Sequence, residues 1–315
     1  MLVQGQDRAV RSRRSCLSVP GSRQRFLEKA DSSAADMVLF DLEDSVAPAA
    51  KEQAREQVVQ ALRTYRYEGK VLGLRVNGVD TRWCADDIRH VVEGAGERLD
   101  CVVLPKVEEA GAVHFAHHLL NQLESKLGLG RQLGLELQIE SAKGLENCVS
   151  CALASPRNQT LIFGPVDFAA DMRLPGIRPS DPRTAYPGDF WHYFLARIAV
   201  AARASGLQPI DGPFTEVHDM EGLRESARRS AMLGYDGKWV LNPAQAEVVN
   251  QAFSPSQADF DRADQIVEAY RKATEVDVTG AVMLGEEMID EASRKLALAT
   301  LERGRAAGMT PGSDL

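Results

Sequence analysis

The stretch Leu135-Glu-Leu-Gln-Ile-Glu140 is an apolar run with strand character that ends in a carboxylate. A second run, Leu161-Ile-Phe-Gly-Pro-Val-Asp167, ends in the same way. Short apolar runs of this kind are typical of parallel strands that are buried on both faces. Glu140 and Asp167 would then stand at the same end of successive strands, where two carboxylates can share one hard divalent cation. Arg75, which closes another such run, could face the same point.

Eight runs in the chain have this strand character, and a helical segment follows each of them. They are Ser15–Val19, Met37–Asp41, Val71–Val76, Cys101–Leu104, Leu133–Ile139, Leu161–Gly164, Leu207–Ile210 and Lys238–Leu241. Eight strand–helix repeats in about 240 residues predict a TIM (β/α)8 barrel, which we place at residues 14–253. A doubly wound sheet would need a dinucleotide-binding loop after the first strand. Val19-Pro-Gly-Ser22 does not have that glycine pattern.

Two further helices are predicted after the barrel, around Gln257–Thr274 and Glu286–Arg303, with a glycine-containing link between them. Neither is needed to close the barrel. We therefore expect a C-terminal helical extension at residues 254–315, which could act as a lid over the barrel mouth or reach a neighbouring subunit.

The composition narrows the classes of partner. The chain has 315 residues and a net charge of −8, which argues against a nucleic-acid-binding surface. It contains no apolar stretch as long as a membrane span. Its five cysteines are scattered, and Cys148 and Cys151 fall within a helical pattern where we expect them to pack. An odd, scattered set of cysteines favours a reducing compartment, so a cytoplasmic protein is expected.

Polar residues gather where the predicted strands end. In a TIM barrel the carboxyl ends of the strands carry the active site. The residues there are Asp41, Glu43, Asp44, Arg75, Asn77, Lys106, Glu140, Asp167, Asp211 and Asn242. Carboxylate oxygens suit Mg²⁺, with Mn²⁺ as a substitute, and no histidine-rich set competes for zinc.

The order of short motifs along the chain resembles one family. The motifs are Val-Pro-Gly-Ser-Arg at 19–23, Asp-Leu-Glu-Asp-Ser-Val at 41–46, Leu-Arg-Val-Asn-Gly at 74–78, Leu-Pro-Lys-Val at 104–107, Ile-Glu-Ser-Ala at 139–142, Asp-Gly-Pro-Phe at 211–214 and Gly-Lys-Trp-Val at 237–240. This series resembles the citrate lyase β-subunits and malyl-CoA lyases of the HpcH/HpaI aldolase family. Residues 41–48 and 96–100 resemble the malyl-CoA/β-methylmalyl-CoA lyase branch most.

The resemblance implies a Mg²⁺-dependent TIM barrel that cleaves or forms a carbon–carbon bond in a 3-hydroxyacyl-CoA. It assigns the metal to Glu140 and Asp167, and the substrate carboxylate and oxyanion to Arg75. It makes Asp290, in Met-Ile-Asp at 288–290, a proton-transfer residue that relatives donate across a subunit boundary, so a homotrimer or homohexamer is implied.

The remaining site residues follow from the same matched positions. Glu43 and Asp44 are catalytic candidates. The residues expected to bind substrate or CoA are Ser18, Arg23, Lys29, Ile139, Val166, Leu241 and Asn242, in addition to Arg75, Glu140 and Asp167. Asn242 stands where relatives usually carry histidine.

The expected reaction is the lysis of malyl-CoA to acetyl-CoA and the 2-oxo acid glyoxylate. Within enzymes, the alternatives are a citramalyl-CoA or citryl-CoA lyase, or a synthase that also hydrolyses the thioester as malate synthase does. A non-catalytic acyl-CoA-binding protein is the alternative from a different class.

Overall fold

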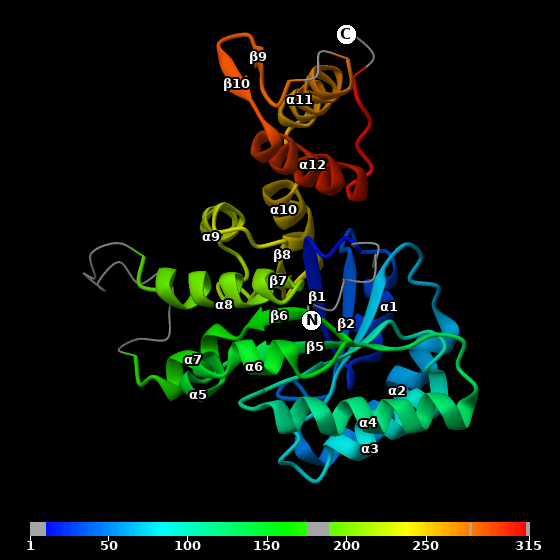
Figure 1. Ribbon diagram of the computed structural model, residues 1–315. Coiled ribbons are helices and arrows are strands. Elements are labelled where there is room, and N and C mark those ends of the chain that lie inside the picture. The colour runs from blue at the N-terminus through cyan, green and yellow to red at the C-terminus, as the bar shows by residue number, and fades with distance from the viewer. Residues whose placement is uncertain (1–10, 175–188, 277–278, 313–315) are drawn as a thin grey trace. The chain divides into compact units, whose positions relative to one another are not determined.

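The computed structural model describes residues 11–174, 189–276 and 279–312, and Figure 1 labels its helices and strands. Eight parallel strands hydrogen-bond in chain order and close into a barrel, so the predicted TIM barrel is confirmed. The strands are β1 (Ser15–Pro20), β2 (Met37–Asp41), β3 (Val71–Arg75), β4 (Cys101–Leu104), β5 (Gly134–Ile139), β6 (Asn158–Phe163), β7 (Gln208–Asp211) and β8 (Gly237–Val240). Each observed strand overlaps the run predicted for it.

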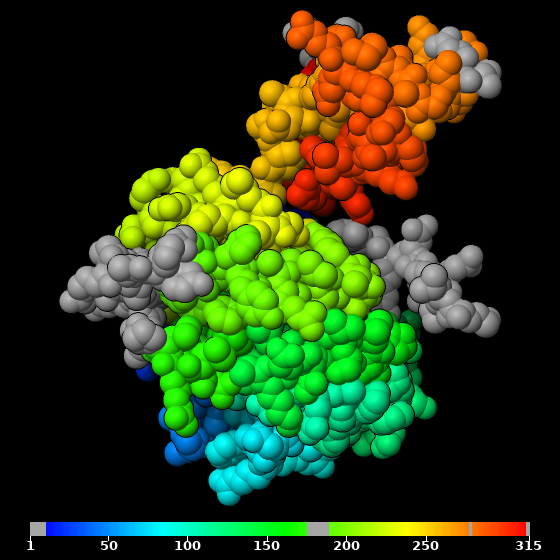
Figure 2. All heavy atoms as spheres, turned by 60° about the vertical axis from the view of Figure 1, so that its left-hand side comes forward, coloured from blue at the N-terminus to red at the C-terminus, as the bar shows by residue number. Residues whose placement is uncertain are grey.

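Helices connect successive strands and cover the outside of the barrel (Figure 1). They are α1 (Gln24–Asp31), η1 (Pro48–Ala50), α2 (Lys51–Thr64), α3 (Cys84–Ala95), α4 (Ala110–Leu127), α5 (Ala142–Glu146), α6 (Cys148–Leu153), α7 (Pro165–Asp171), α8 (His192–Ala204), α9 (Met220–Met232) and α10 (Pro243–Phe253). Figure 2 shows part of this cover, where the green segments that include α4, α6 and α8 form a continuous outer surface. The two cysteines of α6, Cys148 and Cys151, are buried and unbridged, which agrees with a packing role.

Alternation along the strands decides which side chains fill the barrel. Side chains on a strand point to opposite faces in turn. The inward positions form one apolar core: Cys16, Met37, Leu39, Val71, Cys101, Val103, Ile162, Ile210 and Trp239. Two residues beyond Leu39 comes Asp41, and the same step leads from Val71 through Gly73 to Arg75. The strands therefore carry Asp41 and Arg75 to the inner rim of the barrel at its carboxyl end.

At the opposite end of β5 the interior contains an ion pair. Arg13 and Glu136 are both buried, and Arg13 Nε donates to Glu136 Oε1 at 2.8 Å. Glu136 and Gln138 alternate along β5, and Glu140, just after the strand, continues the same alternation toward the inward face. This strand carries polar groups from the interior of the barrel to its mouth.

The chain divides into two compact units, one of which is Arg13–Asn250. The other contains Gln251–Leu315. Its elements are α11 (Gln257–Glu275), β9 (Val282–Leu284), β10 (Glu287–Ile289) and α12 (Glu291–Ala306). Phe260, Ala263, Ala297 and Leu301 form its core. C-terminal helices are thus present as predicted.

One detail of that extension was predicted wrongly. A helix was expected to begin near Glu286, but residues 282–289 form an antiparallel hairpin and α12 begins only at Glu291. Gly285 at the turn has φ +67°, a conformation that glycine adopts without a Cβ penalty. The hairpin therefore depends on a local turn that helical spacing does not reveal.

The described helices do not meet the requirements of a membrane-spanning helix. Within residues 11–174, 189–276 and 279–312, none of the helices combines the length and the apolar composition that a bilayer span requires.

Candidate active site

Asp41 and Arg75 form the fixed base of the site. They are directly opposite each other in the register of β2 and β3. Arg75 Nε and Nη2 donate to the two carboxylate oxygens of Asp41, each at 2.7 Å, and the guanidinium lies 5.2 Å from the centre of the Trp239 ring. Burial favours the neutral carboxyl of Asp41, but the charge of Arg75 and the hydrogen bonds that Asp41 accepts together lower its pKa. The two-point contact fixes the plane of the guanidinium.

The Glu43 carboxylate lies beside the Asp41–Arg75 pair because hydrogen bonds hold the loop after β2 in place. Glu43 N donates to Asp41 Oδ1 at 2.9 Å, and the buried Lys51 Nζ donates to the carbonyls of Leu42 and Glu43 at 2.9 and 3.0 Å. The Glu43 carboxylate is buried, with Oε2 3.0 Å from Arg75 Nη1. Burial raises the pKa of Glu43 above its ordinary value, although the Arg75 charge opposes this. The neighbouring Asp44 is exposed.

Glu140 follows β5 and is 3% exposed. Its Oε1 accepts a hydrogen bond from the backbone N–H of Lys106 at 2.6 Å, and its Oε2 accepts one from Gln138 Nε2 at 2.8 Å. Gly164 leaves room for it, because a Cβ at that position would lie 2.4 Å from Oε2. Burial raises the pKa of Glu140 to about 8, and the nearby charges of Asp167 and Glu43 add to the effect.

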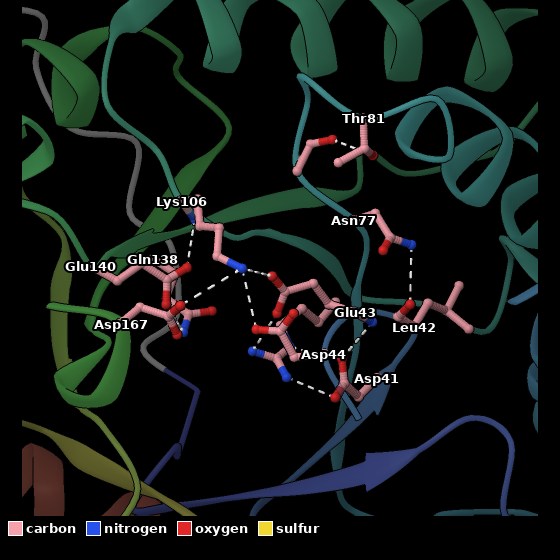
Figure 3. Close-up of polar contacts among 12 residues, drawn as sticks. Asp41, Leu42, Glu43, Asp44, Asn77, Thr81, Lys106, Gln138, Glu140 and Asp167 are labelled. Atoms are coloured by element: carbon pink, nitrogen blue, oxygen red, sulfur yellow. Dashed lines mark hydrogen bonds and ion pairs between the residues drawn. The ribbon is translucent and has the colours of Figure 1, made fainter. Parts of the chain in front are cut away.

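Asp167 does not end a strand: it lies in the first turn of α7, three residues after Gly164. Its side chain is 42% exposed, and its Oδ1 is 3.8 Å from Lys106 Nζ. Figure 3 shows Glu140, Asp167 and Lys106 turned toward one another. The same residues line a cavity of about 350 Å³, together with Val79, Asp80, Glu108, Glu109, Ala112, Ser141 and Asp171.

The donor set fits a hard divalent cation. Two carboxylates, one just after β5 and one in the first turn of α7, face one cavity. Burial raises the pKa of Glu140, and the negative charges of Asp167 and Glu43 add to the effect. Among residues 11–174, 189–276 and 279–312, no three His, Cys, Asp or Glu side chains are arranged to hold a metal ion by themselves. Mg²⁺ suits such a site, because it is usually bound by one or two carboxylates and completes its shell with water or substrate oxygens.

Comparison with known proteins assigns the barrel to a family. Residues 14–243 match the model of the HpcH/HpaI aldolase/citrate lyase family. The chain belongs to this family. The resemblance predicted from the motifs is therefore confirmed, and with it the prediction of an enzyme of the lyase class.

Three relatives illustrate the range of the family. The chain is 38% identical over 297 residues to the L-malyl-CoA/β-methylmalyl-CoA lyase of Cereibacter sphaeroides. The matched region covers 91% of this chain and 93% of the relative. It is 35% identical over 260 residues to a (3S)-malyl-CoA thioesterase of the same species, covering 82% and 84%. The solved structure of CitE from Mycobacterium tuberculosis, in complex with magnesium, acetoacetate and coenzyme A, is 27% identical with a TM-score of 0.72, covering 92% of this chain and 97% of that one.

The other residues predicted on the barrel occupy different positions around its mouth. Ser18 has the same strand parity as the inward-facing Cys16 and lies nearer the carboxyl end of β1. Ile139 is buried in β5, whereas Val166 is exposed in the first turn of α7. Leu241 is also exposed, just after β8.

Asn242, which the resemblance predicts to bind substrate, has a clear local contact. Its Oδ1 accepts a hydrogen bond from Ala244 N at 3.0 Å, at the start of α10. Leu241 N donates to Gln245 Oε1 at 2.8 Å, which holds the same turn.

Two predicted CoA-binding cations lie on α1, after β1. Arg23 is exposed at the N-terminal boundary of the helix, close to the strand end. Lys29 is exposed in the last turn, about 9 Å further along the helix axis. The helix thus places Arg23 nearer the mouth than Lys29.

Asp290 lies in the second compact unit, outside the residues that the family model matches. It is the N-cap of α12, and its Oδ1 accepts hydrogen bonds from Ser293 N at 3.0 Å and Ser293 Oγ at 3.2 Å. The bond from the Ser293 N–H lowers the pKa of Asp290. The carboxylate is therefore ionised at neutral pH and fixed in direction.

Two residues at the centre of the site had no predicted role. Lys106 was recognised only as one of the polar residues at a strand end, and Gln138 was not singled out. The alternation of Glu136, Gln138 and Glu140 along one strand was a signal for Gln138, since it repeats a polar side chain on the inward face.

Proposed function

We propose that this protein is a Mg²⁺-dependent carbon–carbon lyase. Its substrate would be a 3-hydroxyacyl-CoA such as L-malyl-CoA, cleaved to, or formed from, acetyl-CoA and glyoxylate. The observation that carries the proposal is that Glu140 and Asp167 face one cavity, with Arg75 held at the rim by Asp41. The named activities of the relatives support a CoA ester as substrate.

Glu140 and Asp167 would hold the cation. Mg²⁺ would act there as a Lewis acid toward the hydroxyl and carboxylate oxygens of the substrate. Gln138 and the Lys106 N–H fix the Glu140 carboxylate, so the ligand needs little reorganisation on binding. Mn²⁺ should substitute, because it accepts the same oxygen ligands.

Arg75 would bind the substrate carboxylate and the oxygen that becomes the carbonyl. A guanidinium has five N–H donors, and Asp41 and Glu43 orient the group through three contacts. The remaining donors belong to a fixed, always charged group whose side chain is only 11% exposed. Such preorganised donors stabilise developing negative charge without reorganising during the reaction.

Cleavage requires two proton movements. A base removes the hydroxyl proton as the carbonyl forms and the carbon–carbon bond breaks, and its electrons pass to the thioester as an enolate. The enolate carbon then takes a proton from an acid to give acetyl-CoA. We assign the transfer of this proton to Asp290 of a neighbouring copy. Its ionised carboxylate removes the proton from the acetyl methyl group when the carbon–carbon bond forms, and the same group, once protonated, returns it in cleavage. Glu43 and Asp44, at the barrel mouth, are the candidate groups for the hydroxyl proton.

Binding of the CoA portion is assigned to the side of the mouth formed by β1 and α1. Arg23 and Lys29 are exposed cations that can pair with CoA phosphates, and Ser18 lies nearby on the strand. A homotrimer or homohexamer in solution would allow Asp290 to reach the site of a neighbouring subunit. Sedimentation or light scattering would measure that state directly.

The decisive assay combines the protein with Mg²⁺ and pairs of substrates. Acetyl-CoA or propionyl-CoA is offered with glyoxylate, pyruvate or oxaloacetate, and the CoA esters are measured by mass. Malyl-CoA formation with glyoxylate is expected; it should disappear with EDTA and in Asp167→Asn. Glu146→Gln, at the exposed end of α5, is the matched control that should leave turnover unchanged. Acyl-CoA binding without any product would contradict the proposal and favour a binding protein.

Thioester hydrolysis is the second candidate, because one relative is named as a (3S)-malyl-CoA thioesterase. Free CoA and malate would identify that activity in the same assay. Cleavage of citramalyl-CoA or citryl-CoA would instead appear as product formation with pyruvate or oxaloacetate.

A further inference from the structure

Lys106 contacts four carboxylates at the barrel mouth, those of Glu43, Asp44, Glu140 and Asp167. It follows β4 and Pro105, and its backbone φ is +51°. Among the described residues, only Tyr67, Lys106 and Arg173 combine a side chain with a positive φ. Such backbone conformations persist only where the surroundings impose them, and they cluster at functional sites.

This backbone conformation lets one residue act in two directions. Its N–H donates to Glu140 Oε1 at 2.6 Å, while its side chain crosses the mouth toward the loop after β2. There Nζ donates to Glu43 Oε1 at 2.6 Å and to Asp44 Oδ2 at 3.2 Å, and it lies 3.8 Å from Asp167 Oδ1 (Figure 3). Lys106 therefore differs from an ordinary surface lysine, which pairs with a single carboxylate.

The ammonium group also lies close enough to the proposed metal site to interact electrostatically with a bound metal ion. It is 3.8 Å from Asp167, one of the two carboxylates assigned to Mg²⁺, and its side chain is 42% exposed, so it is free to withdraw into solvent. A monovalent and a divalent cation that share one carboxylate repel each other strongly at such distances. The lysine charge should therefore weaken Mg²⁺ binding while supporting the carboxylates when no metal is bound.

We propose that Lys106 is a built-in counter-ion of the metal site. In the metal-free protein its ammonium offsets part of the negative charge of Asp167, Glu43 and Asp44. When a divalent cation binds, the ammonium leaves Asp167 and remains on Glu43. This inference rests on the metal site of the proposed function. It makes Lys106 the residue that sets the affinity and the exchange of the metal.

The test is a calorimetric titration of EDTA-treated, dialysed protein with Mg²⁺ alone, at pH 8 and low salt. Lys106→Met keeps the backbone N–H and most of the side-chain volume but removes the charge. Its Kd for Mg²⁺ should fall about tenfold, as expected from the loss of one nearby like charge. Lys106→Arg, which keeps the charge, should stay within about threefold of the wild type.

Lys143→Met is the matched control. Lys143 is exposed on α5, and its Nζ pairs with Glu108 at 3.3 Å rather than with the four carboxylates at the mouth. This variant removes the same formal charge, and its Kd for Mg²⁺ should change less than about twofold. An equal gain in Lys143→Met and Lys106→Met would overturn the proposal in favour of a general effect of net charge.

A second measurement follows thermal unfolding with EDTA and then with excess Mg²⁺. Lys106→Met should melt below the wild type without metal, because its carboxylates repel, and should regain the difference with Mg²⁺. Should that variant not fold, Lys106→Gln takes its place in both measurements.

The outcomes separate the two proposals. If the wild type binds no Mg²⁺, the proposed metal site is wrong. If the wild type binds Mg²⁺ but removal of the Lys106 charge leaves the affinity unchanged or lowers it, the counter-ion role is wrong while the metal site stands.

Discussion

Replacing Glu140 by glutamine should stabilise the metal-free protein while abolishing its metal site. Glu140 is buried beside Asp167 and Glu43, and its pKa is raised from 4.5 to about 8. At pH 7 the unfolded chain gains the full free energy of ionising this carboxyl, whereas the folded protein keeps it largely protonated. At roughly 1.4 kcal/mol per pH unit, the interval from 4.5 to 7 amounts to about 3 kcal/mol against folding. Glutamine has no such cost.

The sign of the effect sets its pH dependence. Because the folded-state pKa lies above the unfolded one, the folded protein binds more protons between pH 4.5 and about 8. The stability of the wild type without metal should therefore fall as pH rises through this range. The advantage of Glu140→Gln should be near zero at pH 4.5 and largest near pH 8.

The local hydrogen bonds can accommodate the amide. Glu140 accepts from the Lys106 N–H and from Gln138 Nε2, so the new NH₂ group would face a donor. Gln138 Oε1 is buried and has no hydrogen-bond partner in the part of the chain that the structure describes. A flip of the Gln138 amide would then turn that oxygen toward the new donor.

The assay is urea unfolding in EDTA at pH 5 and pH 8, for the wild type and Glu140→Gln, followed by repetition with Mg²⁺. We expect the variant to be more stable by a few kcal/mol at pH 8 in EDTA, and Mg²⁺ to stabilise only the wild type. A variant less stable than the wild type at pH 8 in EDTA would refute the claim that Glu140 is held at an electrostatic cost.

Three further predictions concern the metal, the guanidinium and the C-terminal acid. Mg²⁺ binding should weaken as pH falls below about 8, because Glu140 must lose its proton before it can bind the metal. Calorimetry in buffers of different ionisation enthalpy should detect the proton released on binding. If no proton is released at pH 7, the raised pKa of Glu140 is contradicted. Arg75→Lys cannot keep the two-point contact with Asp41 and should lower kcat about a hundredfold or more while the Kd for Mg²⁺ stays within about threefold; near-normal turnover would argue against the fork. Asp290→Asn keeps a good helix cap, so its Tm should stay near that of the wild type while lyase turnover falls; unchanged turnover would remove Asp290 from the reaction.

Most of the barrel could be predicted because each strand is a short buried run between clear helical segments. Strands that are buried on both faces are almost continuously apolar, so they can be recognised from the sequence alone. The hairpin around Gly285 has strands of only three residues. Among their side chains only that of Ile289 is buried, so neither a buried apolar run nor helical spacing marks the hairpin. Its position depends on a turn, and turns are specified by very few residues.

The sequence indicated where the proposed metal ligands lie in the fold, but it did not indicate the contacts between the residues of the site. Glu140 and Asp167 stand at chain positions that the fold sends to one end of the barrel. The contacts of Lys106 depend on its positive backbone φ angle, and a lysine residue gives no sign of such an angle in the sequence. The pairing of Asp41 with Arg75 depends on the register of two strands, which only the assembled sheet fixes.

The central claim is that one divalent ion is shared by two carboxylates, one after β5 and one in the first turn of α7. Its most direct test is a crystal grown with Mn²⁺, in which anomalous scattering locates the metal. The account predicts one ion within about 2.5 Å of a carboxylate oxygen from both Glu140 and Asp167, with the Lys106 ammonium moved away from Asp167. An ion that contacts only one of the two carboxylates, or that binds elsewhere on the barrel, would contradict it.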